Sequence, residues 1–112
     1  CGILGVYDKS NVEKELFLKS LKLLEKRGPD NISSDLFTDR LIFGHTRLSI
    51  IDLDSQSNQP FSLQNRYHVT FNGEIFNYIE LKEELLFLGH NFKTNSDTEV
   101  LLCSYIEWGE NA

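Results

Sequence analysis

The sequence predicts an α+β protein in which antiparallel sheet is layered with helices. Short runs of β-branched and aromatic residues recur at hairpin-like spacing, for example at residues 36–43 and 66–71. Two stretches with helical spacing of apolar residues follow Ser-x-x-Glu helix-start signals, at residues 10–13 and 96–99. Because strands and helices come in mixed order, a layered α+β arrangement follows most simply.

The first 35 residues predict a strand, a helix and a loop. Residues 3–7 have the apolar character of a short buried strand. The helix after Ser10 ends before Gly28 and Pro29, because both residue types stop helices. The polar residues 31–35 predict a loop. The apolar face of the helix is formed by Val12, Leu16, Phe17, Leu21 and Leu24.

Two strands are predicted next, on either side of Gly44 and His45. They span residues 36–43 and 46–52. The second contains a β-branched and mostly apolar run at residues 48–51, which is typical of a buried strand.

The sequence after residue 53 predicts a loop, then another strand, and then a tight turn. Residues 54–60 are rich in Ser, Gln and Asn and predict a turn-rich loop. Residues 66–71 alternate between apolar and polar side chains, as a strand does. Asn72 and Gly73 follow as the strongest tight-turn dipeptide in the sequence.

Two helices are predicted near the end of the chain. The first spans residues 78–88 and stops at Gly89. The second begins with Ser96 at its cap and stops at Gly109. Cys103 lies in the apolar run of this helix and is predicted to be a small core residue.

Composition narrows the class of protein. The chain has 112 residues, close to the size of one domain, and 40% of them are hydrophobic. The net charge of -6 argues against binding of nucleic-acid phosphates, and no apolar stretch is long enough to span a membrane. Two cysteines without a cluster of metal ligands indicate neither a metal site nor an oxidising compartment. We therefore expect a cytoplasmic protein that binds neither nucleic acid nor membrane.

Cys1 combines a nucleophile and a base in one residue. A thiolate is a strong nucleophile that needs a nearby base, and an α-amine can take the thiol proton directly or through one water. In model peptides both groups titrate near the pH at which proteins work. Because the sequence contains no Met, either an initiator Met is removed before Cys1 or the chain is an internal piece.

Five motifs occur in an order that resembles the class II glutamine amidotransferase domain, and in particular the glutaminase half of asparagine synthetases. The resemblance covers essentially the whole chain. An N-terminal Cys followed by the other four motifs in this order is specific for the family, although no single motif is. The motifs are Cys-Gly-Ile at residues 1–3, Arg-Gly-Pro-Asp at 27–30, Gly-His-Thr-Arg-Leu-Ser-Ile-Ile-Asp at 44–52, Phe-Asn-Gly-Glu-Ile-Phe-Asn-Tyr at 71–78 and Ser-Asp-Thr-Glu-Val at 96–100.

The resemblance implies a fold and a reaction. The family has the N-terminal-nucleophile fold, an αββα sandwich of two antiparallel sheets between helical layers. Its members hydrolyse glutamine through a thioester on the N-terminal cysteine, which is Cys1 here. The oxyanion that develops needs two donors, and the family's donors correspond to the Asn72 side chain and the Gly73 backbone N–H. An ordinary hairpin turn is the alternative interpretation of that dipeptide.

The resemblance also implies a pocket for the substrate. Arg47 would bind the α-carboxylate, since a guanidinium has two-pronged geometry and is costly in an apolar strand unless paired. Backbone groups of Leu48, Ser49, Ile50 and Ile51 would line the pocket. Glu74 and Asp97 would hold the α-ammonium, although a carboxylate in the first turn of a helix is favourable in any case.

Expectations also follow for three further residues and one motif. Glu99 is assigned to helix capping alone. His45 and His68 are expected to be structural, because the family uses no catalytic histidine. The motif at residues 27–30 is expected near the nucleophile, without a named role.

The resemblance places residues 1–112 as the N-terminal portion of the amidotransferase domain, with a C-terminal synthetase domain absent from the chain. No cofactor is expected here, while ATP and Mg²⁺ are expected in the synthetase domain that receives the ammonia. A homodimer is one expected assembly, because missing strands would leave sheet edges bare. Two alternatives stay open: a glutaminase domain of another amide-forming synthetase, such as one that modifies a cell-surface saccharide, or a non-catalytic remnant.

Overall fold

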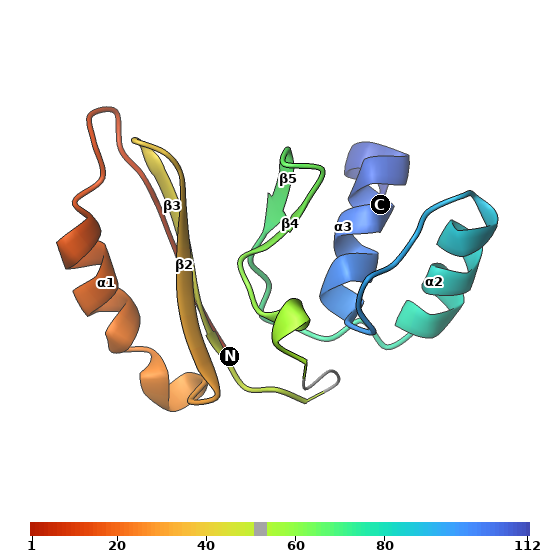
Figure 1. Cartoon of the computed structure of the whole chain (residues 1–112), viewed down its shortest axis with the longest axis horizontal. Helices are drawn as coiled ribbons and strands as arrows, with labels where there is room; N and C mark the ends of the chain where they lie inside the picture. Colours follow the sequence, from red (N-terminus) through yellow and green to blue (C-terminus); the bar gives the residue numbers. More distant parts are fainter. Residues whose placement is uncertain (51–53) are drawn as a thin grey trace. The chain divides into compact units, whose positions relative to one another are not determined.

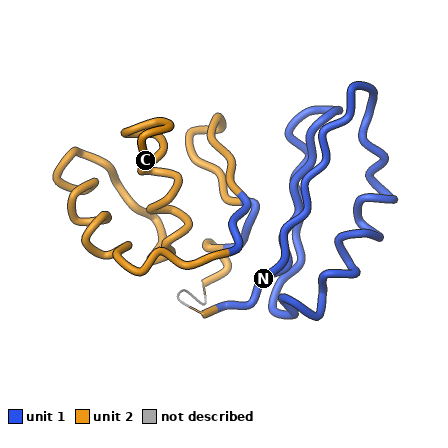
Figure 2. Tube along the Cα trace, turned by 180° about the vertical axis from the view of Figure 1, so that it is seen from behind, with its two compact units in different colours: residues 1–49, 58–60, 70–72 blue, residues 50–57, 61–69, 73–112 orange. Residues whose placement is uncertain are grey.

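The computed structural model describes residues 1–50 and 54–112 and confirms the α+β class with antiparallel sheets. The described part divides into two compact units, coloured in Figure 2. The first unit is built mainly from residues 1–49 and also includes two short segments from later in the chain, 58–60 and 70–72. The second unit contains the remaining described residues. Each unit has an antiparallel sheet and at least one helix, which are the kinds of layer that an N-terminal-nucleophile sandwich contains.

The first unit is organised around a three-stranded antiparallel sheet (Figure 1). Its strands are β1 (Gly2–Tyr7), β2 (Asn31–Thr38) and β3 (Leu41–Arg47). The order is β1-β3-β2, so β3 is paired on both sides, and Thr46 faces Gly2 on one side and Ile32 on the other. The predicted strand at residues 3–7 is therefore confirmed, but it is not buried, since Ile3 is 46% and Tyr7 is 69% exposed.

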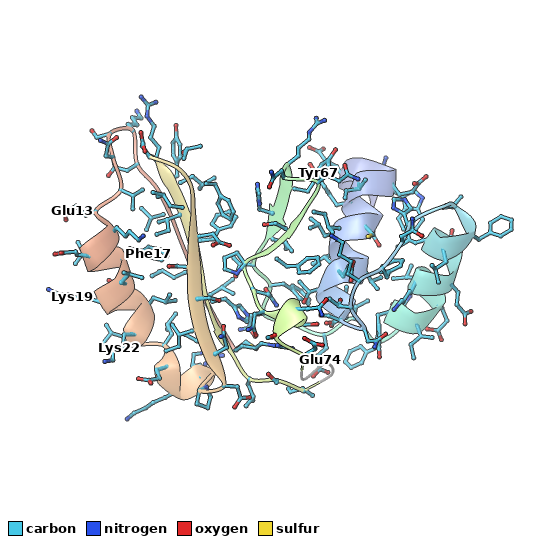
Figure 3. All side chains as sticks on the ribbon, viewed as in Figure 1. Glu13, Phe17, Lys19, Lys22, Tyr67 and Glu74 are labelled. Carbon is cyan, nitrogen blue, oxygen red and sulfur yellow. The ribbon has the colours of Figure 1, made fainter. Side chains whose placement is uncertain are left out.

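Helix α1 (Lys14–Lys22) covers one face of this sheet (Figure 1). It buries Phe17 and Leu21 against Ile42 of β3. Figure 3 shows Phe17 directed towards the sheet, whereas the labelled lysines of the helix point away from it. Leu16 is 59% exposed, so the buried face of the helix is narrower than its apolar pattern suggested.

The predicted capping box at residues 10–13 is wrong. The helix begins at Lys14, and Glu13 rather than Ser10 occupies the N-cap position. The backbone N–H of Ser10 donates to Asp8 Oδ1 at 2.8 Å, which closes a local turn. An aspartate side chain that bonds the backbone two residues on competes with helix formation, and here this turn occupies the predicted start.

Gly44 and His45 do not separate two strands, contrary to prediction. Both lie within the continuous strand β3. A Cβ on Gly44 would lie 2.7 Å from Leu21 Cδ2, so glycine is required in mid-strand for α1 to pack closely. The predicted strand at residues 46–52 is confirmed only for residues 46 and 47, because β3 ends at Arg47 and residues 48–50 form a loop. Residues 51 and 52 of that prediction lie outside the described residues.

The polar stretch at residues 31–35 is strand β2 rather than the predicted loop. It pairs with β3 in a register that places Asn31 opposite Arg47 and Ser33 opposite His45. An edge strand of this kind tolerates polar side chains, and its pairing with a distant strand overrides local propensity. The predicted strand at residues 36–43 is consequently divided by the turn between β2 and β3.

The second unit contains a short hairpin and two helices (Figure 1). Strands β4 (Phe61–Leu63) and β5 (Tyr67–Val69) pair antiparallel. Helices α2 (Tyr78–Phe87) and α3 (Asp97–Trp108) pack together, and the 3-10 turn η2 (Ser55–Ser57) precedes the hairpin. The buried core consists of Leu85, Val100 and Cys103.

The tight turn of this unit lies away from the predicted dipeptide. Gln64 and Asn65 connect β4 to β5, and both have positive φ, at 55° and 53°. Two consecutive positive values are typical of the turns whose twist matches a hairpin. Asn72 and Gly73 follow β5 in a loop that leads to α2, so the hairpin interpretation of that dipeptide is wrong.

The predicted helix ends of the second unit are confirmed. Gly89 has φ 98°, and the N–H groups of Gly89 and His90 donate to the carbonyls of Leu86 and Leu85, which terminates α2. Gly109 has φ 60° and begins the terminal 3-10 turn η3 (Gly109–Asn111). Across the described ranges, no helix has the length and apolar character needed to cross a membrane.

Candidate active site

Cys1 is held at both ends of its main chain by one residue, Arg27. The terminal amine donates to the carbonyl oxygen of Arg27 at 2.8 Å. Arg27 Nε donates in return to the carbonyl oxygen of Cys1 at 3.0 Å. Arg27 is the last residue of the 3-10 turn η1 (Glu25–Arg27), so the chain that follows α1 fixes the N-terminus. In the neutral amine, one N–H remains engaged while the nitrogen lone pair can accept a proton.

The thiol of Cys1 lies against the main chain of Leu48. The Leu48 backbone N–H donates to Cys1 Sγ at 3.3 Å, and Sγ lies 3.6 Å from the Leu48 carbonyl oxygen. The first bond favours the thiolate, because an N–H donor stabilises a developing negative charge. The second is available to the protonated thiol as a weak donor. The geometry therefore serves both protonation states of a nucleophile.

The Arg-Gly-Pro-Asp motif shapes the backbone beside this thiol. A Cβ on Gly28 would lie 2.2 Å from the carbonyl oxygen of Thr46, so only glycine fits there. Asp30 receives the Ser49 backbone N–H on Oδ2 at 2.7 Å, and its own N–H donates to the Arg47 carbonyl at 2.9 Å. The predicted nearness of this motif to Cys1 is confirmed, and its contacts hold residues 46–49 in place.

Arg47 is the last residue of β3 and is only 7% exposed. Its Nη1 donates to Asn58 Oδ1 at 2.8 Å, which makes Asn58 one of its partners. A buried guanidinium is costly unless its donors are bonded, so this contact orients the group as well as stabilising it. Arg47 and Cys1 both belong to the first unit.

The predicted oxyanion donors lie at the point where the chain leaves the first unit. Asn72 is the last residue of the segment 70–72, and its side chain is exposed. Gly73 is the first residue of the following part of the second unit. The two predicted donors are adjacent in the chain but fall into different units.

The two predicted ammonium ligands are linked through the backbone of the second unit. Asp97 opens α3 and is 6% exposed, and its Oδ2 accepts the Ile75 backbone N–H at 3.1 Å. Ile75 directly follows Glu74, whose side chain is exposed and labelled in Figure 3. Asp97 therefore fixes the segment that carries Glu74.

The assignment of Glu99 to capping alone is wrong. Ser96 does cap α3, because its Oγ accepts the Thr98 N–H at 3.1 Å. Glu99 is fully buried and instead accepts the backbone N–H groups of Lys93 and Thr94 and the Thr94 hydroxyl, at 2.6–3.2 Å. The carboxylate thus closes the loop that leads into α3.

The predicted pocket-lining run is only partly placed. Leu48 and Ser49 lie in the first unit, where both backbone N–H groups are engaged as described above. Ile50 is 65% exposed and belongs to the second unit. Ile51 lies outside the described residues.

Cys103 differs from Cys1 in its surroundings. It is 2% exposed in the core of the second unit, as predicted. Burial, and secondarily the nearby charge of Glu99, raise the pKa of its thiol to about 11. At neutral pH this thiol is protonated and shielded, so it is unsuited to nucleophilic attack.

The histidines have local partners. His68 lies in β5, and its Nδ1 is 2.7 Å from Ser62 Oγ on the paired strand β4. His45 is fully buried in β3, with Nε2 3.2 Å from the Phe71 carbonyl oxygen. These contacts agree with the expected structural roles.

Comparison with known proteins shows which family the chain belongs to. Residues 1–112 match the model of the family described as "Glutamine amidotransferase domain". The chain belongs to this family. The amidotransferase chain is 44% identical to glutamine-hydrolyzing asparagine synthetase 1 of Bacillus subtilis (strain 168), with 100% of the chain and 18% of that protein aligned. It is 37% identical to glutamine-hydrolyzing asparagine synthetase B of Escherichia coli (strain K12), with 97% of the chain and 20% of that protein covered.

The amidotransferase chain spans about a fifth of the length of these relatives.

Sequence reasoning did not name several residues that shape its site. The motif at residues 27–30 drew attention to Arg27 and Asp30 but did not predict their contacts. Those contacts depend on the pairing of β1 with β3, which the sequence does not show. Asn58 gave no signal, because a polar residue in a turn-rich loop is ordinary.

Proposed function

We propose that this chain hydrolyses glutamine to glutamate and ammonia, with Cys1 as the nucleophile. The observation that carries the proposal is the pair of contacts on Cys1, whose Sγ receives the Leu48 N–H at 3.3 Å while its amine is held by the Arg27 carbonyl at 2.8 Å. One residue thus presents an oriented base and a thiol with a donor in place.

The proposed reaction proceeds in two halves. The neutral amine takes the thiol proton, and the thiolate attacks the carboxamide carbon of glutamine. The tetrahedral intermediate then collapses as the ammonium returns the proton to the leaving nitrogen, which departs as ammonia. A water molecule, deprotonated by the same amine, attacks the thioester and releases glutamate and the free thiol.

The other predicted residues complete the proposal. The Asn72 side chain and the Gly73 N–H are assigned to the oxyanion, where donors act on charge that develops in the transition state. Arg47 is assigned to the substrate α-carboxylate, and Glu74 and Asp97 to its α-ammonium. Backbone groups of residues 48–51 are assigned to the lining.

We propose further that the full-length protein passes the ammonia to an ATP- and Mg²⁺-dependent synthetase domain that makes asparagine. The names and lengths of the relatives support this acceptor over a saccharide-modifying synthetase. A cytoplasmic location and a homodimer remain predictions of the same proposal.

An extra residue in front of Cys1 tests the N-terminal mechanism. It would convert the amine to an amide, which is no base, so we expect loss of glutamate release from glutamine. Synthesis from added ammonia should survive. The measurement compares full-length protein with and without the extra residue, with intact mass confirming each form, and equal glutamate release would refute the mechanism.

A further inference from the structure

The oxyanion-hole residue Asn72 follows a residue whose backbone is held on both sides. The Phe71 N–H donates to Gln59 Oε1 at 2.5 Å. The Phe71 carbonyl oxygen lies 3.2 Å from His45 Nε2. The carbonyl of residue 71 and the N–H of Asn72 belong to one planar peptide group. The His45 contact therefore sets the direction of the chain as it enters Asn72.

Both side chains that hold Phe71 are themselves buried. His45 is fully buried in the central strand β3, and Gln59 is 7% exposed. Gly44 faces α1, so the alternation of β3 directs His45 to the opposite face of the sheet. The hydroxyl of Ser33, in the neighbouring strand β2, donates to the Gln59 carbonyl oxygen. The two contacts on Phe71 are therefore anchored in the sheet, one by His45 of β3 and the other through Gln59 by Ser33 of β2.

The tautomer of His45 follows from its partner. A carbonyl oxygen only accepts, so Nε2 carries the proton and donates. Burial, and to a lesser degree the N-terminal amine and Arg47, lower the pKa of His45 despite its backbone hydrogen bond, so the ring is neutral at pH 7. Its Nδ1 is buried and has no hydrogen-bond partner among the residues that the structure describes. The ring's contact with the Phe71 carbonyl is consequently its principal polar interaction.

We propose that His45 and Gln59 are positioning residues for the oxyanion hole, which fix residue 71 so that Asn72 is held ready for the transition state. The inference rests on the proposed glutaminase function. These contacts also account for the inclusion of residues 58–60 and 70–72 in the first unit, drawn in blue in Figure 2. They act through the backbone, so neither side chain needs to touch glutamine.

Steady-state glutamate release by the full-length protein tests the proposal. His45→Leu removes the donor, and we expect kcat to fall roughly 10- to 100-fold with little change in KM, as for a displaced catalytic group. His45→Gln keeps an N–H donor near the Nε2 position and should recover most of that loss. Ile42→Val, in the same strand but in the core under α1, is the matched control and should lower thermal stability while kcat stays unchanged.

Gln59→Met provides a second route if His45→Leu does not fold. It removes the acceptor for the Phe71 N–H, and we expect the same selective fall in kcat. Hydrogen exchange of the Phe71 and Asn72 amides should be faster in either variant than in Ile42→Val. The positioning role would be overturned if KM rose while kcat stayed unchanged. It would also be overturned if the Phe71 and Asn72 amides exchanged at the same rate as in the control.

The two proposals fail in different ways. Alkylation of Cys1 by iodoacetamide needs no oxyanion hole, so its rate should be the same in wild type and in both positioning variants. Glutamate release that survives Cys1→Ala would overturn the proposed function, and the hydrogen-exchange comparison would then decide the role of His45 and Gln59 alone.

Discussion

Cys1 and Asp97 are both proposed to act on glutamine, yet their surroundings differ in kind. The amine and the thiol of Cys1 contact main-chain groups, namely the Arg27 carbonyl and the N–H and carbonyl of Leu48. At the start of α3 the arrangement is reversed, because the carboxylates of Asp97 and Glu99 receive N–H groups from Ile75, Lys93 and Thr94.

This difference predicts how each region tolerates substitution. Around Cys1, neighbouring residues act by shaping the backbone, as Gly28 and Asp30 do. At the start of α3, one carboxylate satisfies several donors, so its loss leaves several buried groups unpaired. The first region should therefore lose activity before stability, and the second should lose both together.

The largest effect on stability is expected at Glu99. Glu99→Ala leaves two backbone N–H groups and a hydroxyl without their acceptor, and we expect the free energy of opening of α3 to fall by about 3–5 kcal/mol. Glu107→Ala is a matched control on the same helix, since its pair with His90 is partly exposed and worth at most about 1 kcal/mol. Native-state hydrogen exchange of α3 amides measures both, and equal losses would contradict the role of Glu99.

The next effect separates catalysis from binding. Asn72→Ala should lower kcat roughly 10²- to 10³-fold, or about 2.7–4 kcal/mol, with little change in KM, because an oxyanion donor acts on the transition state. Arg47→Ala should mainly raise KM, because a substrate carboxylate bound equally in both states loses uniform binding energy. Steady-state kinetics with circular dichroism as a check of folding distinguish them. If Asn72→Ala changes only KM, the oxyanion assignment is wrong.

The smallest effect is a pH response of the first unit. Because the pKa of His45 is lowered from 6.5, chiefly by burial, the unfolded chain takes up a proton on this ring at a higher pH than the folded chain does. The stability contribution is complete above pH 6.5 and falls by up to about 1.4 kcal/mol per pH unit below it. Protection of β3 amides should therefore decrease more between pH 6.5 and 5.5 in wild type than in His45→Gln. Identical pH dependence in the two proteins would exclude this contribution.

Local signals in the sequence predicted the parts of the fold that depend on neighbouring residues. Gly89 and Gly109 end their helices because positive φ is a property of the single position. Ser96 caps α3 because its partner lies two residues away. The mostly apolar residues 3–7 lie in β1, as their own pattern predicts.

The remainder depends on partners that are far apart in the chain. Residues 31–35 form a strand because β3 pairs with them, and no local pattern records that pairing. The spacing of Ser96 and Glu99 fits a capping box, but the position of the 93–94 loop directs the carboxylate elsewhere.

The candidate site shows the same division between local and distant information. Motifs and resemblance named Cys1, Arg47 and Asp97, because their residue types carry the chemistry. The buried contacts of Gln59 and His45 on Phe71 became visible only once segments 58–60 and 70–72 were placed against the sheet.

Labelling of the full-length protein by a diazo-ketone analogue of glutamine tests the central claim most directly. Such an analogue is attacked by the nucleophile that attacks glutamine, so peptide mass spectrometry should find the label on Cys1 and none on the buried Cys103. Excess glutamine should protect Cys1, and the Cys1→Ala variant should stay unlabelled and release no glutamate. A label on Cys103, or glutamate release by Cys1→Ala at the wild-type rate, would contradict the account.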